Sequence, residues 1–326
     1  MIISRTPLRI SLGGGGTDLP SYYRANGHGF LIAAAITRHV YIAVNDNFDR
    51  DFLLKYSSVE RAADPNTIQH PLLRECIKAF GISGAIEISS MADIPAGTGL
   101  GSSGSFTVGV LKALAQHQHR SLTNEQIAAE ACTIEIERLG ENVGKQDQYI
   151  AATGGISAFT FRDDESVQVE RMNLSRLVRQ RLEEDLLLFY TGVRRSAGEV
   201  LRGEQDSTGS IARTRSSLND TREIGYATRD VLASGDVERF GKILTEQWKL
   251  KYERQPSPLH DEINDIITAG VQHGALGGKL VGAGGGGFIL FFADQKVRLR
   301  EEMARRGLAE VPFGIDYEGS SIIVAN

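Results

Sequence analysis

The chain has 326 residues, of which 41% are hydrophobic and 24% are charged, and this balance predicts a globular protein of two domains. The formal net charge of −5 and the pI near 5.9 exclude a general nucleic-acid-binding protein, so any anion site must be local. No run of 18 apolar residues and no secretory leader pattern occur, so we expect no membrane partner and a cytoplasmic location. Cys76 and Cys132 lack C-x-x-C spacing and are expected to be buried, reduced thiols.

The first 50 residues predict two strands around a glycine turn. Residues 1–12 are apolar and β-prone, the first glycine cluster is Gly13–Gly16, and residues 37–45 alternate between apolar and polar side chains. Asp18 breaks the G-x-G-x-x-G spacing of a dinucleotide site, and Pro20 interrupts the helix that such a site requires. The first cluster therefore does not predict a Rossmann fold.

The second glycine cluster, residues 97–104, lies between a predicted strand at 84–90 and a predicted helix that includes Phe106 and Leu114. Glycines allow backbone amides to approach an anion closely, and the free N–H groups and dipole of a helix N-terminus favour phosphate. The lysine-bearing Walker A pattern does not occur in the chain. The second cluster therefore indicates a kinase with another type of phosphate loop.

Further along, Thr123 and Gln126 have the spacing of a capping box and predict a helix that continues past Glu135 and ends at Gly140. The polar loop 140–148 follows this helix. Such loops between tight elements often carry functional residues.

The second half predicts a separate α+β domain. Residues 161–184 are charged and contain no long apolar run, so we place the domain boundary there, before the predicted strand 186–190. The third glycine cluster, Gly282–Gly287, lies between strand-like residues 279–281 and a buried strand at 288–292.

Taken with these motifs, the chain resembles the GHMP kinases, a superfamily of small-molecule kinases for galactose, homoserine, mevalonate and phosphomevalonate. Pro7 to Asp18 resembles the first family motif, Ile94 to Ser105 the second, and the third glycine cluster the third. The resemblance implies a two-domain α+β fold with the substrate between the domains. Residues 1–175 would form an N-terminal domain with a βαβ arrangement and the phosphate loop, and residues 176–326 a ferredoxin-like C-terminal domain.

Within the superfamily, the chain resembles the D-glycero-D-manno-heptose 7-phosphate kinases in its loop Val143–Gln148 and in Lys279–Phe288. The implied reaction transfers the γ-phosphate of ATP to the anomeric hydroxyl, giving a 1,7-bisphosphate for nucleotide-activated heptose synthesis. Galactokinase-like members have Gly-Glu-His where this chain has Gly14–Gly16, so galactose is disfavoured. The alternatives are another sugar 1-kinase, for L-fucose or an unphosphorylated aldose, and a non-catalytic sensor of sugar and ATP.

The resemblance also implies catalytic residues. Asp147 matches the aspartate that accepts the proton of the attacking hydroxyl or holds it in line, although an isolated loop aspartate often caps a turn. Arg9 matches the basic residue that pairs with this aspartate and faces the transferred phosphoryl group; otherwise it is a surface arginine at a strand end.

ATP and Mg²⁺ are the implied cosubstrate and metal. Glu135 and Ser103 match the metal ligands, and Glu137 competes with Glu135 because only one of two residues spaced by two can face the site. The residues that match the ATP-binding loop are Pro95, Gly97, Gly99, Leu100, Gly101, Ser102, Ser103 and Gly104.

A small-molecule sugar phosphate is the expected partner, and a homodimer is compatible with the sequence. Its phosphate needs basic groups, for which we favour Arg194 and Arg195, with Lys145 and Arg24 as alternatives. Asp18 has an alternative role as an N-cap after the first glycine cluster. The residues expected to contact the sugar are Gly14, Gly15, Thr17, Asp18, Gly284, Gly285 and Gly286.

Overall fold

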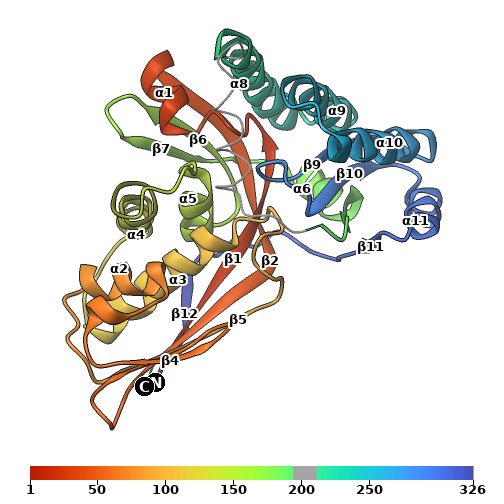
Figure 1. Cartoon of the computed structure of the whole chain (residues 1–326). Helices are drawn as coiled ribbons and strands as arrows, with labels where there is room; N and C mark the ends of the chain where they lie inside the picture. Colours follow the sequence, from red (N-terminus) through yellow and green to blue (C-terminus); the bar gives the residue numbers. More distant parts are fainter. Residues whose placement is uncertain (194–210, 326) are drawn as a thin grey trace.

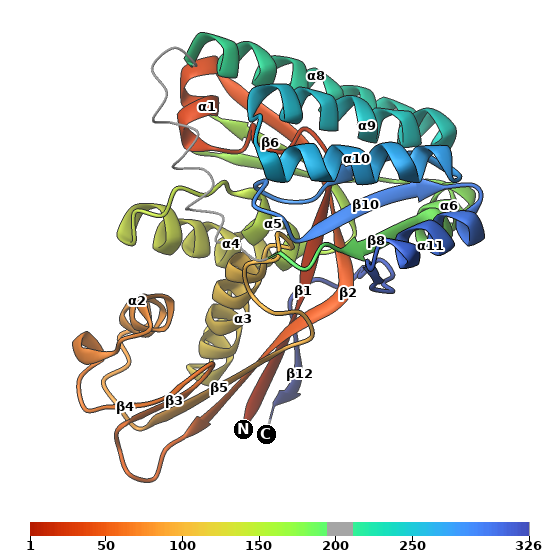
Figure 2. The ribbon, with the colours of Figure 1, turned by 45° about the vertical axis from the view of Figure 1, so that its right-hand side comes forward.

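The computed structural model describes residues 1–193 and 211–325. They form two β-sheets with helices packed against them, and the two ends of the chain lie close together (Figure 1). The turned view shows helices α8 (Ile211–Ser234), α9 (Val237–Arg254) and α10 (Pro258–Gln272) side by side above the second sheet (Figure 2).

Eight strands of the described chain form the first sheet, in the order β12-β1-β2-β5-β3-β4, with β6 beside β2 and β7 beside β6. Its strand pairs are antiparallel apart from β3 with β5. The strands are β1 (Ile2–Gly13), β2 (His28–Asp46), β3 (Phe52–Lys55), β4 (Val59–Ala62), β5 (Ile86–Ala92), β6 (Ile156–Arg162), β7 (Val167–Arg171) and β12 (Ser321–Ala325).

Strand β2 is longer than its sequence pattern predicts. The alternation at 37–45 marks its second half, but residues 29–36 are all buried and therefore show no alternation. Helices α3 (Ser102–His117) and α8 (Ile211–Ser234) both pack against this strand, which explains the uninterrupted burial.

Helices of the first half pack around α3, which follows the second glycine cluster. The predicted capping box at Thr123 is confirmed, since its hydroxyl accepts from the Gln126 amide while the Gln126 side chain accepts from the Thr123 amide. Cys76 and Cys132 are buried and unpaired, as expected. The other helices are α1 (Pro20–Asn26), the 3-10 helix η1 (Pro65–Thr67), α2 (Pro71–Ala79), α4 (Asn124–Cys132), the π-helix η2 (Thr133–Arg138) and α5 (Gln146–Thr153).

In the described part of the second half, four antiparallel strands form a sheet in the order β11-β8-β10-β9. By chain order these are the fourth, first, third and second strands, with helices after the first and third, which is the ferredoxin-like arrangement. The strands are β8 (Leu186–Tyr190), β9 (Ala275–Leu280), β10 (Phe288–Ala293) and β11 (Ala309–Glu310). The helices are α6 (Arg176–Asp185), α8, α9 (Val237–Arg254), α10 (Pro258–Gln272) and α11 (Lys296–Arg305).

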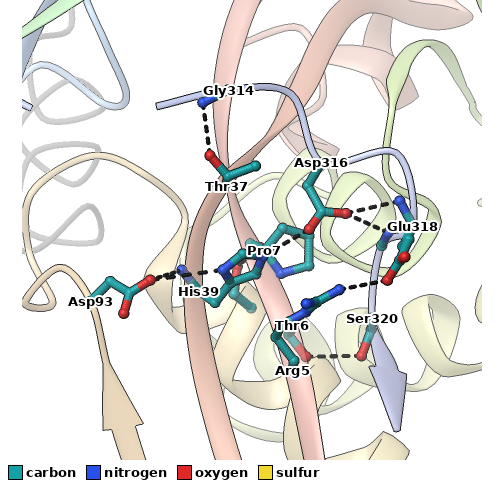
Figure 3. A network of polar contacts seen from close by, with 12 residues as sticks. Arg5, Thr6, Pro7, Thr37, His39, Asp93, Gly314, Asp316, Glu318 and Ser320 are labelled. Atoms are coloured by element: carbon teal, nitrogen blue, oxygen red, sulfur yellow. Dashed lines mark hydrogen bonds and ion pairs between the residues drawn. The ribbon is translucent and has the colours of Figure 1, made fainter. Parts of the chain in front are cut away.

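The last strand returns to the first sheet, where β12 pairs with β1. A polar network holds the segment before it (Figure 3). The His39 ring lies 2.7 Å from Oδ2 of Asp316, and Oδ1 of the same carboxylate accepts from the amides of Glu318 and Gly319. The division at residue 175 stays a prediction, and the final strand belongs structurally with the first sheet.

One core cluster extends across the two halves, and a second lies within the second half. The first cluster includes Phe159 of β6, Phe240 of α9 and Phe292 of β10. The two sheets are therefore joined by apolar packing, which holds the groups between them in place. Among the described residues, no helix is both long enough and apolar enough to span a membrane.

Candidate active site

The second glycine cluster forms the loop between β5 and α3. Gly101 is the N-cap of α3 and has φ of 74°, in the left-handed region that favours glycine. The amides of the first turn of α3 point toward the loop. Because glycine has no side chain to cap them, a phosphate can accept from these amides.

The second and third glycine clusters lie directly against each other. A Cβ on Gly282 would come within 2.6 Å of Gly99 Cα, and one on Gly287 within 2.0 Å of the Thr98 carbonyl oxygen. Side chains at these positions would separate the two loops. Glycine is therefore required in the third cluster because the phosphate loop packs on its backbone.

Arg9 and Asp147 form a two-point ion pair beside the phosphate loop. Arg9 Nε lies 2.6 Å from Asp147 Oδ1 and Nη2 lies 2.9 Å from Oδ2, while Nη1 donates to the Gly99 carbonyl. The arginine side chain is only 6% exposed and the aspartate 24%, so water screens this pair weakly. The pair thus joins β1, the phosphate loop and α5.

Asp147 owes its position to close helix packing. It lies in the first turn of α5, and a Cβ on Gly104 of α3 would come within 2.8 Å of Asp147 Cβ. The glycine therefore lets α5 approach α3 closely enough for the carboxylate to reach Arg9.

Asp18 is buried beside this pair. Its carboxylate accepts from the amides of Gly16 and Gln146, both at 3.1 Å. Burial, and secondarily the charge of Asp147, raise the pKa of Asp18. The N-cap of α1 is Leu19, so the alternative role of Asp18 as the cap of that helix does not apply.

Glu135 lies in η2 and meets Ser103 of α3. The Ser103 hydroxyl donates to Glu135 Oε2 at 2.7 Å, and the Gln148 amide donates to Oε1 at 3.0 Å. Burial raises the pKa of Glu135 to about 7, although these hydrogen bonds act in the opposite direction. Glu137 is exposed.

A cavity opens on the other side of the Arg9–Asp147 pair from the phosphate loop. Residues of β1, α5, α8, α9 and β9 line it, so both halves of the chain contribute. Its lining includes the carboxylates of Asp18 and Asp147 and the basic side chains of Arg9, Lys251, Arg254 and Lys279. A carboxylate thus lies between a loop suited to phosphate and a cavity suited to a polar acceptor.

Comparison with known families agrees with this geometry. Residues 66–155 match the family described as GHMP kinases N terminal domain, and residues 228–308 match GHMP kinases C terminal. The chain belongs to the GHMP kinases.

Relatives of this GHMP kinase include kinases named for sugars. It is 28% identical over 307 residues to the D-glycero-alpha-D-manno-heptose 7-phosphate kinase of Campylobacter jejuni, covering 90% of this chain and 89% of the relative. It is also 28% identical over 250 residues to the galactokinase of Pyrococcus furiosus, covering 69% and 68% of the two chains.

A solved structure shares the whole fold. The D-glycero-D-manno-heptose 1-phosphate kinase from Bacteroides thetaiotaomicron superposes with a TM-score of 0.79 over 100% of both chains, at 23% identity. The predicted two-domain α+β fold is confirmed.

The structure places several predicted sugar-binding residues away from the cavity of this GHMP kinase. Gly15 and Asp18 line it, whereas Gly14, Thr17 and residues 284–286 do not. The Thr17 hydroxyl donates within the first glycine cluster, to the Gly14 carbonyl at 2.9 Å. The predicted ATP-binding residues Pro95, Gly97, Leu100 and Ser102 do not line this cavity, whereas Gly99 of the same loop accepts a hydrogen bond from Arg9.

Of the residues predicted to hold the substrate phosphate, the alternatives Lys145 and Arg24 do not line the cavity. Arg194 and Arg195 lie outside the described residues. Lys145 and Arg24 instead bind Glu165, with nitrogen–oxygen distances of 2.7 and 2.5 Å. Burial would raise the pKa of Glu165, but these hydrogen bonds and one from a tyrosine lower it to about 2. Both cations therefore pair with this carboxylate, and neither lines the cavity.

The sequence analysis did not identify Lys251, Arg254 and Lys279 as residues of the cavity lining, although a signal for two of them exists. Gln247, Lys251 and Arg254 recur at helical spacing in α9 and share one face. Charges on a helix usually mark a solvated surface, so this face does not stand out until the fold brings it against β9. Lys279 belongs to the Lys279–Phe288 motif, but the glycines of that motif drew the interpretation.

Proposed function

We propose that this sugar kinase transfers the γ-phosphoryl group of ATP to the anomeric hydroxyl of D-glycero-α-D-manno-heptose 7-phosphate. The product would be the 1,7-bisphosphate, an intermediate for nucleotide-activated heptose. The observation that carries the proposal is the position of the Arg9–Asp147 pair, which contacts the glycine loop before α3 and lines a cavity that further basic side chains also line. The name of the Campylobacter relative supports the choice of sugar. Because the reaction consumes ATP and a phosphorylated metabolite, we expect it to take place in the cytoplasm.

In this proposal, Asp147 orients the acceptor hydroxyl and takes its proton as the new O–P bond forms. Phosphoryl transfer depends mainly on positioning and on neutralising charge, so one carboxylate and one guanidinium at the junction suffice on the acceptor side. Arg9 binds the Asp147 carboxylate through two contacts and places positive charge near the transferred group. Asp18, held by two backbone amides, accepts a hydrogen bond from another sugar hydroxyl.

The pairing of Ser103 with Glu135 fits a magnesium ion. Both supply oxygen, which Mg²⁺ prefers, and one carboxylate with one hydroxyl leaves positions for water and phosphate oxygens. In the part of the chain that is described, no group of three or more His, Cys, Asp or Glu side chains forms a metal cluster. When bound, the ion neutralises charge on the ATP phosphates.

The test is ADP release by the purified protein with Mg-ATP and a panel of acceptors. The panel contains D-glycero-D-manno-heptose 7-phosphate, the unphosphorylated heptose, mannose, galactose, L-fucose, homoserine and mevalonate. Turnover of the heptose phosphate well above the others is expected. Turnover of an unphosphorylated sugar alone would retain the family reaction and reject this substrate, whereas ATP binding without any turnover would favour a sensor.

A further inference from the structure

The two carboxylates that line the cavity, Asp18 and Asp147, meet at the chain segment that leads into α5. A Cβ on Gly144 would come within 1.8 Å of Asp18 Oδ2, and the Gln146 amide donates to the same oxygen at 3.1 Å. Burial, and then the charge of Asp147, raise the pKa of Asp18. Because two ionised carboxylates repel each other, this segment needs contacts that keep both of them facing the cavity.

Lys145 attaches the segment to the turn between β6 and β7. Its ammonium group donates to Glu165 Oε2 at 2.7 Å and to the Glu165 carbonyl oxygen at 2.9 Å, while its backbone amide donates to the Asp18 carbonyl oxygen at 3.4 Å. Lys145 is the N-cap residue of α5, two positions before Asp147. It is buried and does not line the cavity, so it can act on the acceptor only through neighbouring residues.

Glu165 joins this segment to α1 as well. Its carboxylate accepts from the Tyr23 hydroxyl at 2.7 Å and from Arg24 Nε at 2.5 Å, and the Lys145 ammonium lies 5.2 Å from the centre of the Tyr23 ring. Glu165 has φ of 70°, in the left-handed region where glycine is favoured. The turn alone would favour glycine there, so the contacts of the carboxylate give a physical reason for a glutamate.

We propose that Lys145 is a positioning residue for phosphoryl transfer: its pair with Glu165 fixes the start of α5 and thereby the direction in which Asp147 faces the acceptor. This inference rests on the proposed function, which gives Asp147 its role. Arg9 holds the Asp147 carboxylate from the side of β1, whereas Lys145 holds the backbone of the same helical turn from the side of α1 and β6. A displacement of about 1 Å at a reacting group can slow a reaction about 100-fold, so a contact outside the cavity can control turnover.

The test measures kcat of Lys145→Met in two backgrounds, wild type and Asp147→Asn, with Mg-ATP and an acceptor from the panel. Methionine has a similar length but cannot pair with Glu165. In the wild-type background, kcat is expected to fall about tenfold, while the KM for ATP changes less than about twofold. In the Asp147→Asn background, kcat is expected to change less than about twofold, because the carboxylate that Lys145 positions is already absent. A merely structural role would lower kcat by the same factor in both backgrounds.

Lys55→Met is the matched control, since Lys55 pairs with Glu87 between β3 and β5 and does not line the cavity. It should leave kcat unchanged, and Lys145→Arg should restore part of what Lys145→Met loses. The midpoints of urea unfolding show whether the variants are folded. Glu165→Gln keeps the shape of its side chain and removes the charge, so it should lower kcat in the same direction if Lys145→Met does not fold.

Hydrogen exchange gives a second measurement that needs no acceptor. Exchange of the amides of residues 146–149 in the unliganded protein is expected to be at least about tenfold faster in Lys145→Met than in wild type, and unchanged in Lys55→Met. Unchanged exchange, an unchanged kcat in Lys145→Met, or an equal loss of kcat in both backgrounds would overturn the positioning role. Faster exchange without turnover of any acceptor in the panel would instead reject the proposed function and leave the anchoring of α5 intact.

Discussion

At the scale of single residues, the candidate site depends on charges whose partners are distant in sequence. Arg9 and Asp147 are separated by 138 positions and meet in two short contacts. Family motifs identify both residues, but their distance and burial follow from the packing of α5 against α3 and β1. Removing the charge of Asp147 therefore tests the chemistry with little change of shape.

Asp147→Asn should lower kcat at least about 100-fold while ATP affinity stays near the wild-type value, because the amide keeps the size of the side chain but cannot accept a proton. Steady-state ADP release and titration with an ATP analogue measure the two effects. Asp163→Asn, at an exposed aspartate, is the control. Near-normal turnover of Asp147→Asn would remove Asp147 from its catalytic role.

Glu135 leads to a prediction about pH. Its pKa is about 7 in the folded protein against an ordinary value of 4.5, so the folded state holds the proton more tightly than the unfolded state does. The contribution to stability is complete below pH 4.5 and is lost as the pH rises to 7, by about 3 kcal/mol. Without Mg²⁺ and ATP, the difference in unfolding free energy between wild type and Glu135→Gln should fall over this range.

Urea unfolding at several pH values gives this difference, and Glu137→Gln is the control at an exposed glutamate. Parallel pH profiles for wild type and Glu135→Gln would show that the Glu135 carboxyl titrates normally. In that case the Glu135 carboxyl beside Ser103 would be accessible to water in solution.

At the scale of elements, helices and loops set the distances between the reacting groups. The strand–glycine loop–helix order of the phosphate loop was predicted from the sequence, because glycine and the start of an apolar helix leave local signals. The approach of α5 to α3 has no such signal. It depends on Gly104, which the sequence suggests only as part of the phosphate loop.

Gly104→Ala should lower kcat about tenfold or more and destabilise the protein by about 1–3 kcal/mol, because the added methyl group would push α5 and Asp147 away from α3. Enzyme assays and urea unfolding measure the two effects. Gly314→Ala is the control, since its Cβ would meet Thr37 at an ordinary 3.5 Å. Unchanged kinetics in Gly104→Ala would mean that the helices adjust without moving the carboxylate.

At the scale of the whole molecule, the last strand ties the end of the chain to its beginning. Asp316 accepts from the His39 ring and from two backbone amides, and both side chains are buried (Figure 3). Although burial alone would raise the pKa of Asp316, these hydrogen bonds lower it from 3.8. Its stabilising contribution is therefore present above pH 3.8 and is lost on acidification through the folded-state pKa.

Asp316→Ala should lower the free energy of unfolding by about 2–4 kcal/mol, because it leaves a buried histidine and two amides without their acceptor. It should leave the kcat of the folded enzyme close to wild type, since Asp316 does not line the cavity. Glu318→Ala, which removes an exposed partner of Arg5, should change stability by less than about 1 kcal/mol. Equal stabilities of the two variants would contradict the role of this network.

The sequence by itself determined the family, the two-domain α+β class and the glycine loop between a strand and a helix, and it predicted the candidate pair Arg9 and Asp147. These features depend on glycines, local periodicity and motif order, which are properties of short segments. The tertiary structure decided which basic groups reach the cavity. Lys145 pairs with Glu165, whereas Lys251 and Lys279 line the cavity. A lysine carries the same charge in every segment, so its role depends on which carboxylates and cavities the fold brings to it.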